Sequence, residues 1–185
     1  KRPLIIFCPT GSYFPRFVNQ QPVGDKTDSA TVEFAKEFAK RGYVVANISY
    51  RQGWGVTSSD QDVRTGTILN AVYRSIHDAK TAARFMSKTA ALDGNPYKID
   101  STKVAIGGNG TGGYVAINTV SLDKVSELYI DKFINFNKTP NEPYVDTALS
   151  GNIDGTNVRP LNLANWANHS ANFNFAFTIG GALGD

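Results

Sequence analysis

The chain has 185 residues, 41% of them hydrophobic and 11% aromatic, so a self-sufficient core that buries roughly 70% of the unfolded surface is possible and disorder is not expected. One cysteine, Cys8, and two histidines exclude an intramolecular disulfide and leave too few ligands for a Cys/His zinc site, and we expect no metal or other cofactor. The formal net charge of +3 comes from scattered basic residues, and no apolar stretch approaches 18 residues, so we expect no nucleic-acid partner and no transmembrane segment.

The first half of the chain alternates between predicted strands and helices. Residues 4–8 are a continuous apolar run, which is typical of a strand buried on both faces. After a polar loop, a helix is expected from an N-cap at Asp28 or Ser29 to the glycine Gly42. Residues 43–50 predict the second strand, and turn residues follow it.

The second half continues the alternation. Apolar residues at spacings of three and four predict a long amphipathic helix over about 67–89. Residues 103–106 predict the third strand, and 114–122 the helix after it. The Asn-rich stretch 123–172 is less regular, and 173–179 predicts the last strand. Such alternation indicates a parallel sheet with helices on both faces.

The glycine-rich turn after the third strand carries the chemical signal. Residues 108–113 have the spacing of a dinucleotide fingerprint, but Asp131, at about the right distance for its acidic partner, follows no clear strand. A phosphate loop would need a lysine that this turn lacks. The competing interpretation of the same turn is a strand-to-helix elbow of the kind that displays a nucleophile.

Four segments support the elbow in order and spacing. Residues 99–114 resemble the nucleophile segment of carboxylesterases and lipases of the α/β-hydrolase superfamily, and residues 9–13 resemble their His-Gly-Gly-Gly-Phe oxyanion loop. Tyr50-Arg51 is similar to the Tyr-Arg that ends the family's next strand, and Asp78 to the aspartate of the helix before the elbow. The resemblance implies an α/β-hydrolase sheet, of which this chain supplies about strands three to six of the order 1-2-4-3-5-6-7-8.

The resemblance also implies which residues form the site. The nucleophile position of the Gly-x-Ser-x-Gly pattern is Gly110, so the attacking oxygen is missing, through natural loss or deliberate replacement. Thr111 is a poor substitute, because its side chain is one residue along the elbow and points elsewhere. Backbone amides of Gly11 or Ser12, with that of Thr111, are the expected oxyanion donors, although Gly11 also suits a tight turn on its own.

Three other residues with catalytic potential, two histidines and the cysteine, have simpler interpretations. His77 lies on the helix before the elbow, where a packing role is expected. His169 precedes the last strand, whereas the family's histidine follows its final one, so we expect a loop role. Cys8 ends a buried strand and is expected to act as a small hydrophobe.

The leading interpretation is a carboxylesterase- or lipase-like domain that is catalytically impaired at Gly110, with an ester or acyl compound as its ligand. A structural or partner-binding module on the same scaffold is the alternative, with residues 123–172 as a lid or partner surface, and a nucleotide-binding domain comes third. Residues 1–185 are expected to be part of one domain whose open sheet edges are completed by further polypeptide. An extracellular or cell-surface location is expected from the composition.

Overall fold

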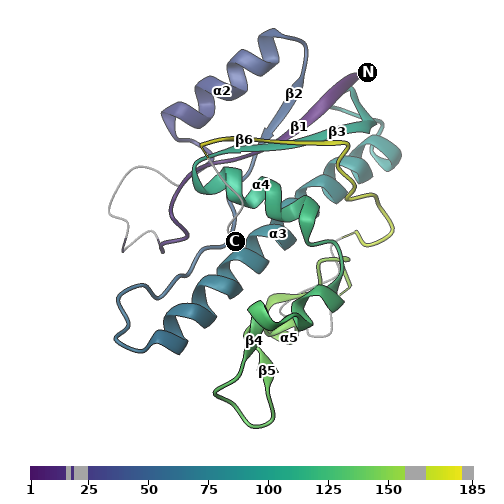
Figure 1. The fold of residues 1–185 in the computed structure, drawn as a ribbon. Helices are drawn as coiled ribbons and strands as arrows, with labels where there is room; N and C mark the ends of the chain where they lie inside the picture. The colour runs from purple at the N-terminus through teal and green to yellow at the C-terminus, as the bar shows by residue number, and fades with distance from the viewer. Residues whose placement is uncertain (16–17, 19–24, 157–165, 181–185) are drawn as a thin grey trace.

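Four parallel strands form the central sheet in a computed structural model of the chain, which describes residues 1–15, 18, 25–156 and 166–180 (Figure 1). The strands are β1 (Arg2–Cys8), β2 (Val44–Asn47), β3 (Ile99–Asn109) and β6 (Phe175–Ile179). Their spatial order is β2-β1-β3-β6. This is the order four, three, five, six that the resemblance implied, so the expected fold class is confirmed.

Helices cover both faces of the sheet (Figure 1). Helix α2 (Ser29–Lys40) packs on one face against β1 and β2. Helices α3 (Gln61–Leu92) and α4 (Thr111–Ser121) pack against each other and cover the opposite face. The first crossover therefore runs over one face and the next two over the other, because the chain steps from β1 out to β2 and then back across the sheet to β3 and β6 with the same handedness.

The two-sided burial of β1 explains its uninterrupted apolar sequence. The Phe7 ring contacts Phe34 and Phe38 of α2, with centroid distances of 5.7 and 6.1 Å. On the other face, Leu4 and Ile6 lie fully buried in the core beneath α3 and α4. Burial of each such side chain contributes about 1.5–3 kcal/mol.

Several element boundaries differ from those predicted. Helix α3 begins at Gln61, six residues earlier than predicted, because Asp60 caps it by accepting a hydrogen bond from the Asp62 amide at 2.8 Å. Helix α4 begins at Thr111, directly after Gly110, rather than at residue 114. Strand β3 is longer than predicted, because residues 99–100 also pair with β1 before a register shift.

Short elements occupy the described part of the Asn-rich stretch predicted to be less regular, of which residues 157–165 lie outside the described residues. These elements are the 3-10 helices η1 (Val125–Tyr129) and η2 (Asp131–Phe133), the hairpin strands β4 (Ile134–Asn135) and β5 (Glu142–Pro143), and helix α5 (Thr147–Ser150). Asp62 ties this hairpin to α3, because its carboxylate accepts hydrogen bonds of 2.9 Å from Asn137 Nδ2 and Tyr144 Oη.

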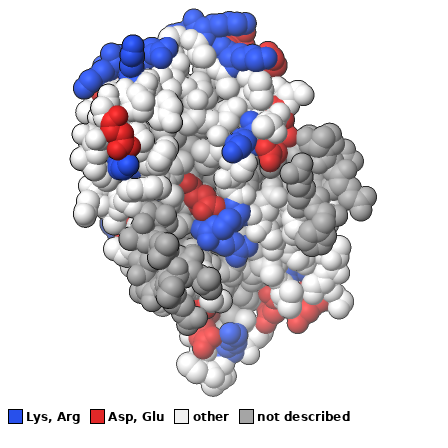
Figure 2. Space-filling model, turned by 180° about the vertical axis from the view of Figure 1, so that it is seen from behind, with Lys and Arg blue, Asp and Glu red and all other residues white. Residues whose placement is uncertain are grey.

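Within the described residues no further strand pairs with the outer edge of β2 or of β6. On the face shown in Figure 2, many acidic and basic side chains lie beside one another in small groups. In the same residues we find no helix with the length and apolar character needed to cross a bilayer.

Candidate active site

A single residue separates strand β3 from helix α4, which follows it in the sequence. That residue, Gly110, has φ 53° and ψ −120°, a conformation that L side chains rarely adopt. Its amide donates to the Ile179 carbonyl at 2.8 Å, and its carbonyl accepts from the Gly113 amide at 2.8 Å. The backbone therefore makes the sharp strand-to-helix turn on which a nucleophile elbow depends.

The glycines on either side of the elbow are required by close backbone contact. A Cβ atom on Gly112 would collide with the Cys8 carbonyl and lie 2.6 Å from the Pro9 oxygen. A Cβ atom on Gly108 would collide with the Gly112 carbonyl and lie 2.8 Å from the Cys8 oxygen. The flanking glycines of the Gly-x-Ser-x-Gly pattern thus keep their packing role although the serine is absent.

Thr10 fills the space above the elbow. A Cβ atom on residue 110 would lie 2.5 Å from Thr10 Oγ1 and 3.2 Å from Thr10 Cβ. Both distances are shorter than ordinary van der Waals contact, so Gly110 and Thr10 fit together as a pair. This role of Thr10 was not predicted from the sequence; the available signal was a threonine in a loop where the resembling family carries consecutive glycines.

The expected oxyanion residues come together around the elbow. The Ser12 amide donates a hydrogen bond of 2.8 Å to Thr111 Oγ1, 99 residues away in sequence. Gly11, at φ 148°, and Ser12, at φ 54°, give the loop its tight turn. Thr111 is the first residue of α4, so its N–H has no acceptor within the helix. In this arrangement the Thr111 hydroxyl occupies the Ser12 amide, which the sequence predicts as an oxyanion donor.

Aromatic side chains hold the oxyanion loop in place. Tyr50 Oη donates to the Pro9 carbonyl at 2.8 Å, and the Tyr50 ring packs on the Tyr13 ring with centroids 5.9 Å apart. The Tyr13 carbonyl accepts hydrogen bonds from the Gly53 and Trp54 amides. Tyr50, the tyrosine of the Tyr-Arg pair, therefore helps to hold residues 9–13 in place.

Neither histidine hydrogen-bonds to the elbow. His77 is buried in α3, and its Nδ1 accepts from Arg51 Nη2 at 2.9 Å, while its Nε2 has no hydrogen-bond partner. His169 lies in the loop before β6, at the amino end of that strand, whereas the elbow follows the carboxyl end of β3. His77 is thus a buried residue of α3, and His169 is a loop residue, as expected from the sequence.

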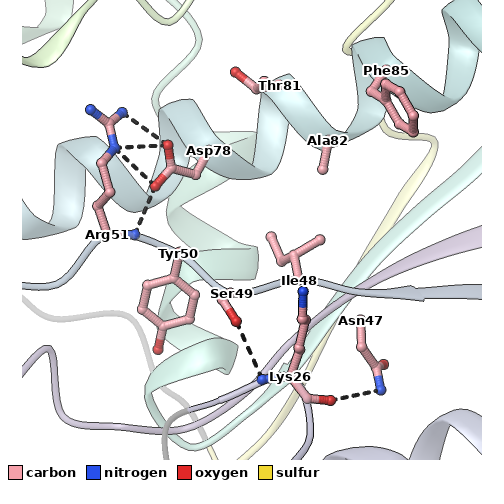
Figure 3. Close-up of a pocket in the computed structure, with 10 residues that line it drawn as sticks. All are labelled: Lys26, Asn47, Ile48, Ser49, Tyr50, Arg51, Asp78, Thr81, Ala82 and Phe85. Atoms are coloured by element: carbon pink, nitrogen blue, oxygen red, sulfur yellow. Dashed lines mark hydrogen bonds and ion pairs between the residues drawn. The ribbon is translucent and has the colours of Figure 1, made fainter. Parts of the chain in front are cut away.

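Arg51 and Asp78 form an ion pair beside a cavity of about 640 Å³ next to β2 (Figure 3). Asp78 Oδ2 accepts from the Arg51 amide at 2.7 Å, and Asp78 Oδ1 accepts from Arg51 Nε at 2.9 Å. Burial raises the pKa of Asp78, but the neighbouring His77 and Arg51 outweigh burial and hold that pKa below its usual range. None of the elbow or oxyanion residues lines this cavity, and the pair ties the segment after β2 to α3.

We expect Asp78→Asn to cost about 2 kcal/mol of unfolding free energy at pH 7, because it removes a partly buried, charge-assisted pair. The folded-state pKa is depressed, so the stabilisation is present above the unfolded value of about 3.9 and is lost as pH falls through the folded value. Urea unfolding at pH 7 and pH 3 should therefore show the gap between parent and variant closing in acid. Asp93→Asn, at the exposed pair with Lys88, is the control and should cost less than about 1 kcal/mol; an equal cost for both variants would contradict the assignment.

No other chemistry is evident near the elbow. Cys8 is a free, buried cysteine, and burial raises the pKa of its thiol above the usual range, which disfavours the thiolate. In the described ranges no three His, Cys, Asp or Glu side chains are grouped so as to hold a metal ion. The groups available at the elbow are hydroxyls and backbone amides.

Comparison with known sequences decides the family. The model of the BD-FAE family matches residues 3–171, which include the oxyanion loop, the elbow and the stretch that follows it. The chain belongs to the BD-FAE family. This BD-FAE domain is an esterase-like member of the α/β-hydrolase superfamily, and its membership favours the elbow interpretation of the glycine-rich turn over the dinucleotide one. No curated protein sequence matches the chain.

Solved structures resemble parts of the BD-FAE chain. An esterase from the Planctomycetes species Thermogutta terrifontis is 22% identical with a TM-score of 0.39, covering 64% of this chain and 33% of its own. A sugar hydrolase from Lactococcus lactis is 16% identical with a TM-score of 0.44, covering 66% of this chain and 40% of its own. The chain thus corresponds to between a third and two fifths of the length of these proteins.

Proposed function

We propose that this chain carries the elbow and oxyanion loop of an esterase-like hydrolase that does not form an acyl-enzyme at residue 110. The supporting observation is the conformation of Gly110, which keeps the φ and ψ of a strained elbow without a side chain to attack an ester. Removing the nucleophile of such a site leaves only about 10³- to 10⁴-fold catalysis over water. The activity is accordingly impaired, and binding is what the site retains.

The neighbouring residues support a natural loss of the serine rather than a recent replacement. A serine-to-glycine exchange by itself would leave free space above residue 110. Here Thr10 fills that space, with its Oγ1 2.5 Å from the position of a residue-110 Cβ atom. The oxyanion loop and the elbow therefore fit each other in the glycine form.

The ligand that suits the site is a small ester or acyl compound. Its carbonyl oxygen would accept hydrogen bonds from the Ser12 and Thr111 amides. Because Ser12 already donates to Thr111 Oγ1, the ligand must displace that hydroxyl, which turns to another staggered rotamer. Binding of the ligand is thus coupled to the rotamer of Thr111.

A fluorophosphonate probe and p-nitrophenyl acetate test this function in the complete protein. We expect no stoichiometric phosphonylation, because no activated hydroxyl is present at the elbow, and only slow ester hydrolysis. Peptide mass spectrometry locates any label, and protein that has been unfolded by heat gives the background. Stoichiometric labelling of Thr10 or Thr111 would overturn the proposal, since either threonine would then be a working nucleophile.

A partner-binding role is the second candidate, favoured by exposed hydrophobic side chains in the stretch after α4. Tyr129 is 67% exposed, Phe136 60% and Leu149 58%, which is unusual for side chains of this size. A partner on this surface should protect the amides of residues 125–150 from hydrogen exchange in the complex. Binding that survives deletion of this stretch would count against the role.

In the part of the chain that the structure describes, no strand pairs with the outer edge of β2 or of β6, which supports a further proposal about how the sheet is completed. Both edge strands present backbone N–H and C=O groups, which in parallel sheets are normally paired with another strand or covered by other parts of the protein. We propose that additional polypeptide, from the same or another chain, pairs with them.

A further inference from the structure

A polar cavity of about 470 Å³ lies near the amino-terminal end of β6, whereas the elbow follows the carboxyl end of β3. Its walls include α3, Asp123 just after α4, and residues 167–172 of the segment that leads into β6. That segment meets β3 at Val104, whose amide donates to Asn174 Oδ1 at 2.8 Å and whose carbonyl accepts from the Asn174 amide at 2.8 Å. The elbow follows Asn109, about 16 Å further along the strand at 3.3 Å per residue, so the cavity is separate from the candidate active site.

Two buried cations face the cavity from one side of α3. Lys80 is 7% exposed and Arg84 is 4% exposed, and a spacing of four residues places them on the same face of the helix. Lys80 Nζ donates to the Leu122 carbonyl at 3.1 Å, and Arg84 Nη2 donates to the Ile153 carbonyl. Among the described residues, buried Arg84 Nη1 has no hydrogen-bond partner. An ammonium has three N–H donors and a guanidinium five, so in this part of the chain their donors outnumber the acceptors that the two side chains contact.

The carboxylates around the cavity do not pair directly with these cations. Among the described residues no carboxylate oxygen lies within 4.0 Å of Lys80 or Arg84. Asp154, which lines the cavity, accepts hydrogen bonds from the Thr156 amide and hydroxyl at 2.9 and 2.7 Å and is engaged in its own turn. Burial lowers the pKa of both cations, and the more distant Asp123, Glu127 and Asp154 offset only part of that effect. Two like charges one helical turn apart thus lack a close counter-charge.

We propose that this cavity binds a small carboxylate between Lys80 and Arg84. A carboxylate offers the planar pair of acceptors that a guanidinium recognises, and one of its oxygens can also accept from an ammonium. Arg84 Nη1 is covered by neighbouring atoms, so the guanidinium turns towards the ligand on binding. A singly charged ligand is preferred to a phosphate dianion, because Asp123 and Asp154 repel the second negative charge. This site is independent of the function proposed for the elbow.

Thermal unfolding of the complete protein in sodium acetate tests the proposal, with sodium chloride and sodium phosphate at the same ionic strength. Acetate should give a saturable rise in Tm of about 3 °C at roughly ten times its Kd, beyond the effect of chloride. Phosphate should raise Tm less than acetate. An equal response to acetate and chloride would overturn the site, and a larger response to phosphate would overturn the carboxylate assignment.

Variants on one helix connect the response to the cavity. Lys80→Met and Arg84→Gln should each abolish the acetate-specific rise, and Lys80→Met should be at least as stable as the parent in chloride, because an unpaired buried charge is removed. Lys88→Met, one turn beyond Arg84 and paired with Asp93, is the matched control and should keep the rise. If Arg84→Gln does not fold, Lys80→Met decides; an acetate-specific rise that persists in Lys80→Met contradicts the proposal.

Discussion

The double variant Thr10→Gly, Gly110→Ser of the complete protein should hydrolyse p-nitrophenyl acetate at least about 10³-fold faster than the parent and should be phosphonylated at residue 110. The serine supplies the missing Oγ on a backbone that already has the elbow conformation, at φ 53° and ψ −120°. Glycine at position 10 removes the side chain that lies 2.5 Å from the new Cβ atom. The gain requires an acid and a histidine from elsewhere in the protein, since neither His77 nor His169 hydrogen-bonds to the elbow.

Gly110→Ser without the change at Thr10 should gain much less. The new Cβ atom would displace Thr10 and with it the oxyanion loop, and a non-glycine residue in this backbone region itself costs about 1–3 kcal/mol. Thermal unfolding of the parent, the two single variants and the double variant gives the coupling between the positions, which should be favourable by at least about 1 kcal/mol. Thr10→Gly alone is the control for the added chain flexibility.

Two results would contradict this pairing of Thr10 with Gly110. Equal activity and stability of the single serine variant and the double variant would mean that Thr10 moves aside without cost. A folded double variant that neither reacts with the phosphonate nor hydrolyses the ester, in a protein that supplies the acid and the histidine, would remove the hydrolase elbow as an explanation of this turn.

Gly112→Ala should destabilise the protein by more than about 4 kcal/mol, which is close to the whole stability of many domains. The added Cβ atom would collide with the Cys8 carbonyl and lie 2.6 Å from the Pro9 oxygen, and neither backbone group can rotate away. Relief requires α4 to move off β1, which opens the core beneath the elbow. Urea unfolding of the variant measures the loss of unfolding free energy. If the loss is too large for the variant to fold, the variant should be absent from the soluble fraction.

Gly94→Ala is the matched control for the glycine change. A Cβ atom there meets nothing within 4 Å, and only its φ of +73° is unfavourable, so the expected cost is about 1 kcal/mol. Similar losses for Gly112→Ala and Gly94→Ala would show that backbone conformation, and not close packing of α4 on β1, is what position 112 requires.

The sheet could be predicted well from the sequence, because buried strands and helices show characteristic patterns of apolar residues. The apolar run at 4–8 and the alternating helices led to a parallel sheet, and the order β2-β1-β3-β6 agrees with strands four, three, five and six of the resembling fold. The start of α3 was missed, because Asp60 caps a first turn that carries few apolar residues. Its glycine, Gly66, packs beside the Tyr144 ring, a contact that no local pattern shows.

At the site, the residue type alone established that Gly110 has no attacking oxygen, and the resemblance of residues 99–114 to the nucleophile segment of esterases placed it at the elbow. Tertiary structure decided what surrounds it: Thr10 occupies the space above Gly110, and Thr111 Oγ1 takes the Ser12 amide. The same holds for the two cations of α3, whose sequence spacing fits a solvated helix face as well as a buried one. The chemical groups of a side chain follow from the residue type alone. Contacts between residues about 100 positions apart, in contrast, form only after the sheet has brought β1 and β3 together.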